Sequence, residues 1–473
     1  MTSVVAPVPS VAVAPGDGPD TEFAAAARVL AARLVSLARV DGLHEPTWTG
    51  DDIDPRSAPD LSSPPMLLHG PLDDGLLTGR AGIAVALSAA SRLPGAPAEW
   101  AHLAVRTAAA SVRRSSSDLA AGVSPAGGIG WESGALGVAR AATVVAEAHG
   151  APGLAAASRH LGGLAVRRVV ERPDELPPFA DLMGGLAGVL AGVLSVPLDE
   201  ADEAARVDAV TLLVERIADL AVAGPIGLRW SMAGADHSVV GLAHGGSGIA
   251  LALTAAARQL AASTTRATVP SPSTYAVGLA SEAMLWEESL HDVGAGGWPD
   301  LRLAEPVPGL AWCHGAPGVG VSAVLRHPLL AAAGHGSRDA ATAHVAFARA
   351  RAASAAHRPV GMQPFDGSVC HGLAGVVEMH LLAAAAWPAA AREHLAEARA
   401  LATHLTRAGR PGRPTWLCGI RAGGRSPNLL VGIGGVALTL ARCHDLSVGP
   451  SAADPFLGAV VTGSLDASTE GTD

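Results

Sequence analysis

Apolar and polar positions form alternating blocks along the chain. Runs almost free of charge, such as 182–198, lie between stretches that mix Arg and acidic residues with Leu and Val, such as 24–40 and 203–222. In the mixed stretches the apolar residues recur at helical spacing and leave the charged residues on the opposite face. We therefore expect outer amphipathic helices, and inner helices that are buried on all sides.

Each of these nearly uncharged runs carries the same short motif at or near its start. The motif is GxxG followed by an apolar helical run, as in "GRAGIAVAL" and "GIGGVALTL". It begins at Gly79, Gly134, Gly185, Gly245, Gly315, Gly372 and Gly432. Neighbouring motifs are 51 to 70 residues apart, which suits two helices and their connections. Because glycine permits tight turns and close backbone approach, we expect the glycine turns to gather at one end.

The repeats predict the fold class. An all-α barrel of about seven helical hairpins, an α/α toroid, would bury the end repeats that an open solenoid has to cap. Apolar residues make up 49% of the chain and aromatic residues only 3%, which favours packed helices over sheet. We assign 22–446 to one toroid domain. The compositions of 1–21 and 447–473 predict disordered tails, and the prolines of 42–66 predict a long loop.

The net charge, the lack of Lys and the N-terminal sequence restrict the functions and compartments that we expect. The net charge is −10, so we expect no binding to nucleic acid or to anionic membranes. The sequence has no Lys, which excludes lysine Schiff-base chemistry and a P-loop lysine. The first residues lack a basic region and contain prolines, so we expect a cytoplasmic protein. The run 182–198 is too short for a membrane span and predicts a buried helix.

Chemistry-bearing side chains precede the glycine turns. Cys313 and His314 stand before one motif, Cys370 and His371 before the next, and His244 before an earlier one. Equivalent positions of neighbouring repeats point at one place, so two thiols and up to three imidazoles can converge. Zinc takes Cys and His, and a catalytic zinc keeps three protein ligands with a fourth position open. From spacing alone, any of the three histidines qualifies as the third ligand.

Other polar residues leave alternatives open. Asp181, four residues before the third motif, is either a helix N-cap or an acid of the site. Cys418 and Cys443 lie outside the turn positions and are expected to be structural. A glycosidase would need paired carboxylates at the mouth, where the turns offer only Asp181 and Glu132. A zinc prenyltransferase would need a basic diphosphate site, which this acidic chain does not indicate.

The motifs "AHGGSGI", "WCHGAPG", "CHGLAG" and "LLVGIGG" resemble those of the lanthionine synthetase C-like family, over roughly residues 25–445. The resemblance implies an α/α toroid with one zinc ion, held by Cys313, Cys370 and His371. It also implies that His244 and Asp181 belong to the active site. We find no kinase or dehydratase domain in this sequence, so we expect a free-standing cyclase.

The activity that the resemblance implies is zinc-dependent formation of (methyl)lanthionine rings. Cysteine thiolates of a dehydrated precursor peptide add to dehydroalanine or dehydrobutyrine. Zinc would lower the pKa of the peptide thiol. His244 would move the proton, with Asp181 holding its tautomer. The dehydrated peptide is the expected partner, and the dehydratase of the same pathway is a further candidate.

Two positions depart from the family pattern. The family has Tyr after the first zinc-ligand Cys, where this chain has His314, whose imidazole could take over the acid–base work. The family often has Arg at the position of Gly309, so another cation is needed, for which Arg80 and Arg421 are candidates. These departures leave one alternative function, a non-catalytic zinc and thiol binding protein that holds glutathione or a peptide.

Overall fold

The fold is built from helices, which the sequence predicts. The computed structural model describes residues 18–53, 66–232, 237–263, 271–331, 342–343, 346, 366–408, 418–420 and 425–459. The helices that begin at the glycine motifs are α2 (Arg80–Ser91), α4 (Ala135–His149), α6 (Leu186–Ser195), α8 (Gly246–Ser263), α10 (Ala316–Ala331), α12 (Leu373–Ala386) and α14 (Ile433–His444). The helices between them are α1 (Gly18–Leu37), α3 (Ala98–Ala120), α5 (Pro152–Glu171), α7 (Glu203–Asp219), α9 (Pro272–Ser289) and α13 (Ala391–Ala408).

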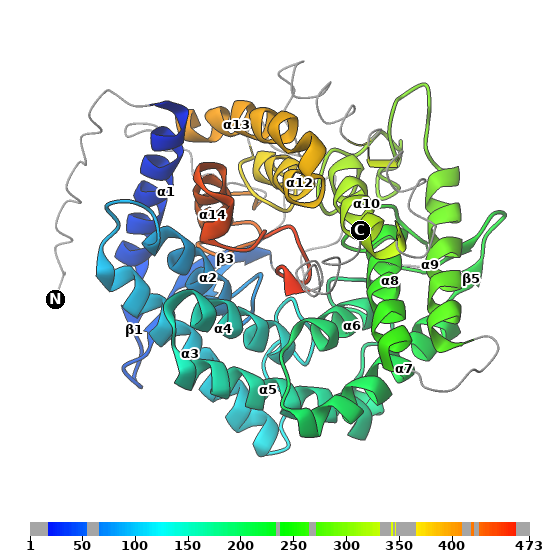
Figure 1. Cartoon of the computed structure of the whole chain (residues 1–473), viewed down its shortest axis with the longest axis horizontal. Helices are drawn as coiled ribbons and strands as arrows, with labels where there is room; N and C mark the ends of the chain where they lie inside the picture. Colours follow the sequence, from blue (N-terminus) through cyan, green and yellow to red (C-terminus); the bar gives the residue numbers. More distant parts are fainter. Residues whose placement is uncertain are drawn as a thin grey trace, which may run out of the picture.

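The helices form two concentric layers (Figure 1). Each inner helix contacts the next, from α2 through α4, α6, α8, α10 and α12 to α14, and α14 contacts α2, so that the inner layer closes on itself. The outer helices α3, α5, α7, α9 and α13 pack against the inner helices that precede them, and α1 packs against α14. The N-terminal helix thus supplies the outer partner of the last inner helix, which joins the two ends of the described chain.

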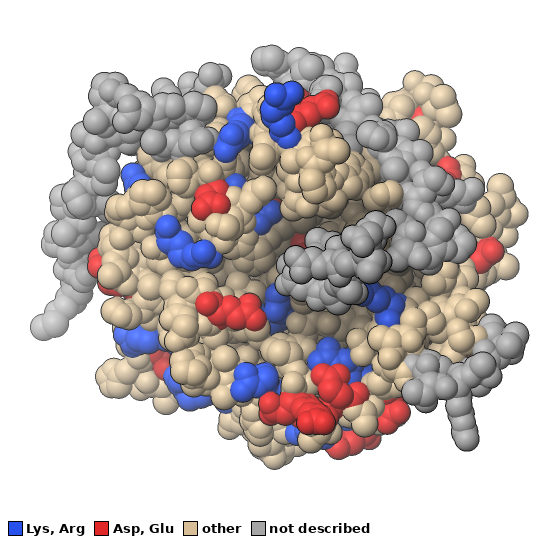
Figure 2. All heavy atoms as spheres, in the orientation of Figure 1, with Lys and Arg blue, Asp and Glu red and all other residues tan. Residues whose placement is uncertain are grey.

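Burial follows the predicted division into layers. Nearly every residue of α2, α6 and α12 is buried, whereas outer helices such as α3 bury one face. Arg and acidic side chains intermingle over the face shown in Figure 2 rather than gathering by sign. Within the described residues, no single helix is long and apolar enough to cross a membrane. One pair of helices, α12 with Pro388–Thr406, is long and apolar enough when the two are counted together, but the pair is bent by 119°.

The two glycines of each motif have separate uses. The first precedes the helix and is extended in five motifs, as at Gly134 before α4, whereas Gly315 has a φ of 132°. A Cβ atom at the second glycine would lie 1.7 to 2.2 Å from the carbonyl oxygen six residues earlier, in every one of the seven motifs. These second glycines are Gly82, Gly137, Gly188, Gly248, Gly318, Gly375 and Gly435. No side chain fits there, so glycine allows each inner helix to start directly against its own incoming turn.

Hydrogen bonds link the seven turns to one another. We call this set of links the turn ring. In order around the barrel, it joins Leu77 N–H to Glu132 O (2.8 Å), Trp131 Nε1–H to Leu182 O (2.8 Å), Leu182 N–H to Ala243 O (3.0 Å), Ala243 N–H to Cys313 O (3.1 Å), Cys313 N–H to Cys370 O (3.0 Å), Cys370 N–H to Leu430 O (3.0 Å) and Leu430 N–H to Leu77 O (3.1 Å). The turns therefore do gather at one end of the inner helices.

Short strands replace part of the expected loop 42–66. Strands β1 (Arg39–Val40) and β2 (Pro46–Thr47) pair with each other, and β3 (Thr49–Ile53) pairs with β4 (Leu67–Pro71). The N–H group of Asp51 in β3 donates to the carbonyl of Arg425 (2.7 Å), which places this hairpin beside the last glycine turn. Farther along, β5 (Val222–Ala223) pairs with β6 (Leu228–Arg229).

The expectation of a disordered tail was wrong for residues 447–459. Ala453 and Phe456 are fully buried, and the carbonyl of Ala453 accepts a hydrogen bond from Trp312 Nε1 (3.0 Å). The small and polar residues of this segment suggest a tail by composition, but apolar side chains among them pack inside the barrel. At the other end, α1 begins at Gly18, inside the predicted N-terminal tail; residues 1–17 and 460–473 lie outside the described residues.

The close approach at the second glycines can be tested by a single methyl group. Gly137→Ala would place a Cβ 1.7 Å from the carbonyl oxygen of Trp131, so the turn or α4 has to move. We expect the free energy of unfolding, measured by denaturant titration, to fall by about 2 kcal/mol or more. Gly153→Ala in α5 is the matched control, because no atom lies within 4 Å of its added Cβ. Equal stability of the two variants would contradict this role of the glycines.

Candidate metal and acid–base site

Two glycine turns bring thiols and an imidazole together. Cys313 precedes α10, and Cys370 and His371 precede α12. One possible ligand atom from each of the three lies within 4.8 Å of those of the other two. The link of the turn ring from Cys313 N–H to Cys370 O holds the two backbones side by side. We call these three residues the thiol cluster; its two sulfurs and one ring nitrogen are a set that could hold a metal ion.

The orientation of His371 fits metal binding. Its Nε2 atom is hydrogen-bonded to the carbonyl of Gly419 and lies 3.3 Å from Oδ2 of the buried Asp366. A carbonyl can only accept, so Nε2 carries a proton; when the ring is neutral, Nδ1 is the nitrogen whose lone pair is left for a metal. Burial acts to lower the pKa of His371, but hydrogen bonding to Cys313 and the charge of Asp366 raise it to about 9.

The two thiols are not equivalent electrostatically. The pKa of Cys313 lies well below its ordinary value, because Cys370 and His371 hydrogen-bond to its sulfur and outweigh the effect of burial. The pKa of Cys370 is raised, first through the same bond to Cys313 and then by burial. The cluster therefore already favours a thiolate at Cys313, which is the form that binds metals.

A second pair lies on the neighbouring turns. His244 Nδ1 is 2.8 Å from Oδ2 of Asp181, whose side chain is only 1% exposed. The other oxygen, Oδ1, accepts from the N–H groups of Gly184 (3.1 Å) and Gly185 (3.0 Å). Asp181 is therefore not the N-cap of α6, which is Gly185; its carboxylate binds its own turn and His244. Burial acts to lower the pKa of His244, but Asp181 raises it above the ordinary value.

His314 stands apart from the thiol cluster although it follows Cys313. Its ring stacks on His244 at a centroid distance of 5.4 Å, and its Nδ1 lies 3.3 Å from the carbonyl of Val240. Burial lowers the pKa of His314 to about 4. Of the three histidines that the sequence left open, the structure places His371 with the two thiols, and places His244 and His314 together beside them.

Three other polar residues lie near these turns; from the sequence, Glu132 was named only as a possible carboxylate, and Asp366 and Arg302 were not named. Glu132 interacts electrostatically with His244, and burial raises its pKa to about 7. Asp366 was missed; it stands six residues before its glycine motif, as Asp73 does before another, and that repetition was the available signal. Arg302 was also missed. It lies in the longest interval between glycine motifs.

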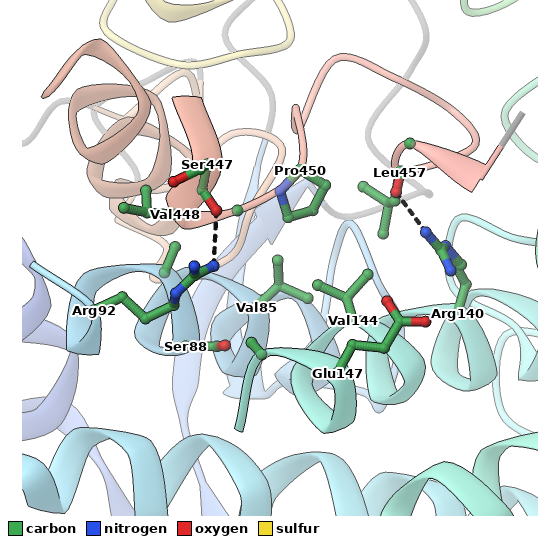
Figure 3. Close-up of a pocket in the computed structure, with 14 residues that line it drawn as sticks. Val85, Ser88, Arg92, Arg140, Val144, Glu147, Ser447, Val448, Pro450 and Leu457 are labelled. Atoms are coloured by element: carbon green, nitrogen blue, oxygen red, sulfur yellow. Dashed lines mark hydrogen bonds between the residues drawn. The ribbon is translucent and has the colours of Figure 1, made fainter. Parts of the chain in front are cut away.

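A pocket outside the thiol cluster is lined by two inner helices and the C-terminal segment (Figure 3). It measures about 450 Å³ and lies between the C-terminal halves of α2 and α4 and the segment 447–458. Arg92 donates to the carbonyl of Ser447 (2.7 Å) and Arg140 to that of Leu457 (2.7 Å), so both arginines hold the C-terminal segment in place. The pocket is therefore not part of the thiol cluster, whose residues are on the glycine turns.

Comparison with known proteins identifies the family. The model of the family "Lanthionine synthetase C-like protein" matches residues 70–451, which is most of the chain. The chain belongs to the lanthionine synthetase C-like family.

Membership agrees with the observed fold. The structure is similar to that of nisin cyclase, with a TM-score of 0.50 and 18% sequence identity, over 78% of this chain and 88% of that chain. At this identity the likeness shows the α/α fold, which confirms the predicted fold class. A comparison with curated protein sequences finds no match.

Arg80 and Arg421 were the candidates to replace the family's arginine, and the structure describes the first of them. Arg80 forms an ion pair with Asp74 (2.8 Å), which also binds Arg114 (3.0 Å), so Arg80 belongs to a charge cluster at the start of α2. Arg421 lies outside the described residues. Cys418 and Cys443, expected to be structural, are both buried, and neither is in the thiol cluster.

The effect of Asp181 on the pKa of His244 can be tested by titration. Asp181→Asn keeps an oxygen for the turn but removes the negative charge, so the pKa of His244 should fall, as followed by NMR. Because the pKa is raised in the folded parent, its stabilising effect is complete below the unfolded pKa of about 6.5 and disappears as pH rises through the folded value. The parent's stability advantage over this variant should therefore shrink toward alkaline pH.

Asp199→Asn is the control for this titration, since Asp199 pairs with Arg159 on the outer surface. It should leave the pKa of His244 unchanged. An unchanged pKa in Asp181→Asn as well would show that the carboxylate does not control the imidazole.

Proposed function

We propose that the protein is a cytoplasmic, zinc-dependent lanthipeptide cyclase. It would join cysteine thiols of a dehydrated precursor peptide to dehydroalanine or dehydrobutyrine residues and so form (methyl)lanthionine thioether rings. The observation that carries the proposal is the thiol cluster beside the His244–Asp181 pair, in a chain of the lanthionine synthetase C-like family. The dehydratase of the same pathway is a candidate docking partner.

The thiol cluster supports zinc as the metal. Two cysteines and one histidine are among the ligands that zinc prefers, and three protein ligands leave one position for a substrate. Cys313, Cys370 and His371 would hold one ion per chain, with His371 binding through Nδ1 because Nε2 is hydrogen-bonded to Gly419. When bound, zinc would lower the pKa of a peptide thiol and so favour its thiolate.

Two imidazoles of this chain would handle protons. When the peptide sulfur attacks the β-carbon, a C–S bond forms, the C=C π bond breaks, and its electron pair moves to the carbonyl as an enolate. His244, oriented through Nδ1 by Asp181, would accept the thiol proton. The protonated His244 would then return this proton to the α-carbon, and His314, which stacks on it at the position of the family's Tyr, would assist that transfer as a neutral ring.

Zinc binding is the first prediction of this proposal. The purified protein should contain about one zinc per chain by elemental mass spectrometry, and Cys313→Ala or Cys370→Ala should contain almost none, because each removes a ligand. Cys443→Ala is the matched control, since Cys443 is also buried but lies in α14 outside the thiol cluster. A folded parent without zinc would rule out the proposed cofactor.

Ring formation is the second prediction. The probe is a capped synthetic peptide with one dehydroalanine and one cysteine; ring closure consumes its free thiol without changing its mass. Mass spectrometry after N-ethylmaleimide treatment therefore separates product from substrate. His244→Asn should lower the rate by about 10²- to 10⁴-fold because the proton acceptor is lost.

His160→Asn on the outer helix α5 is the control and should cyclise the probe at the parent rate. A His244→Asn variant as fast as the parent would contradict the acid–base assignment. A parent that holds zinc and binds the peptide without accelerating ring closure would favour the non-catalytic zinc and thiol binding protein instead.

A further inference from the structure

The connection from α9 to α10 is folded against the thiol cluster. Its residues form isolated bridges between Asp292 and Gly297 and between Pro299 and Pro308. Just before the thiol cluster, Leu310 pairs with Gly315. We call residues 291–310 the site loop, because it runs directly into the turn that carries Cys313.

Arg302 is fixed on the site loop by a two-pronged ion pair. Its Nε and Nη2 atoms donate to Oδ1 (2.9 Å) and Oδ2 (2.7 Å) of Asp300. The backbone N–H group of Asp300 donates to Val307 (2.8 Å), so the carboxylate is itself anchored. Such bidentate pairs fix the plane of the guanidinium. Among the described residues, Nη1 has no hydrogen-bond partner, and the side chain is 23% exposed.

Arg302, on a loop bridged to the thiol turn at Leu310 and Gly315, interacts electrostatically with both thiols. Two effects oppose each other in the pKa of Arg302. Burial lowers this pKa, but the bonds to Asp300 and the charges of Cys313 and Cys370 outweigh burial and raise it above the ordinary value. In turn, the positive charge of Arg302 adds to the effect of burial in lowering the pKa of His314. One cation therefore interacts with both thiols and with the imidazole beside them.

Position 309 cannot provide a side chain here. A Cβ atom at Gly309 would lie 2.3 Å from the carbonyl oxygen of His314, and the N–H group of Gly309 already donates to Trp298 (2.9 Å). The site loop and the thiol turn are in backbone contact at this point. A cation can reach this space from the loop only at another position, and Arg302 is the residue whose charge does so.

We propose that Arg302, held by Asp300, donates a hydrogen bond from Nη1 to the carbonyl oxygen of the dehydro residue during ring closure. This inference rests on the proposed function. As the C–S bond forms and the C=C π bond breaks, negative charge moves to that oxygen until the α-carbon takes up a proton. A fixed donor aimed at developing charge stabilises the transition state more than the substrate, so Arg302 acts mainly on kcat.

The kinetic test compares three variants on the dehydroalanine probe peptide. Arg302→Gln should lower kcat by about 10²- to 10³-fold while its zinc content stays at the parent level. Arg302→Lys should have a kcat between those of Arg302→Gln and the parent, because it keeps the positive charge but loses the planar guanidinium. Asp300→Asn should lower kcat less than Arg302→Gln, since it frees the guanidinium without removing it. Arg159→Gln is the matched control, because Arg159 pairs with Asp199 on the outer surface.

A second test does not depend on catalysis. In the full chain after chelation, Cys313 is alkylated with iodoacetate or with neutral iodoacetamide, and the two rates are compared by peptide mass mapping. A cation beside the thiol favours the anionic reagent, so Arg302→Gln should reduce the iodoacetate-to-iodoacetamide ratio about threefold or more. Arg302→Lys should retain most of the ratio, and Arg159→Gln all of it.

The two tests separate the inference from the proposed function. Unchanged kcat in Arg302→Gln, with a parent that cyclises the probe, would overturn the role of Arg302 and leave the cyclase intact. A parent that forms no ring would count against the cyclase, and the alkylation ratio would then decide on Arg302. Equal ratios in the parent and Arg302→Gln would overturn the placement of the cation.

Discussion

Hydrogen bonds of the turn ring are the constraint on which the rest of the structure depends. They connect the seven turns at one end of the inner helices and join the last turn to the first through Leu430 and Leu77. The second glycine of each motif makes this possible, because it removes the side chain that would separate helix and turn. Cys313 and Cys370 are themselves members of the turn ring. The distance between their side chains is therefore set by backbone bonds rather than by flexible loops.

The same tripeptide has different surroundings in neighbouring repeats. In Cys-His-Gly before α12, Gly419 and Asp366 bind Nε2 of His371, and the ring belongs to the thiol cluster. In Cys-His-Gly before α10, His314 faces Val240 and stacks on His244. The repeat thus supplies equivalent positions, and the neighbours of each turn give them separate chemistry. Burial then lowers the pKa of one imidazole while carboxylates raise that of another.

The site loop adds a cation without changing the repeat. Loops tolerate insertions that helices and turns do not, so a barrel with fixed turns can change its chemistry there. The pair of Arg302 and Asp300 interrupts neither the turn ring nor an inner helix. Because the turns are held by backbone bonds, the site loop can carry Arg302 and Asp300 while the thiol cluster stays together.

The sequence by itself determined the layers, the seven helix starts and the convergence of the Cys-His-Gly turns. These features depend on helical periodicity, on the absence of charge and on glycine, and all three can be recognised within one repeat. Only the tertiary structure distinguished His371 from His314 and His244, buried residues 451–457, and placed the charge of Arg302 near the thiols. Each of those outcomes depends on hydrogen bonds and packing between residues that meet only when the ring closes, so no local pattern could reveal them.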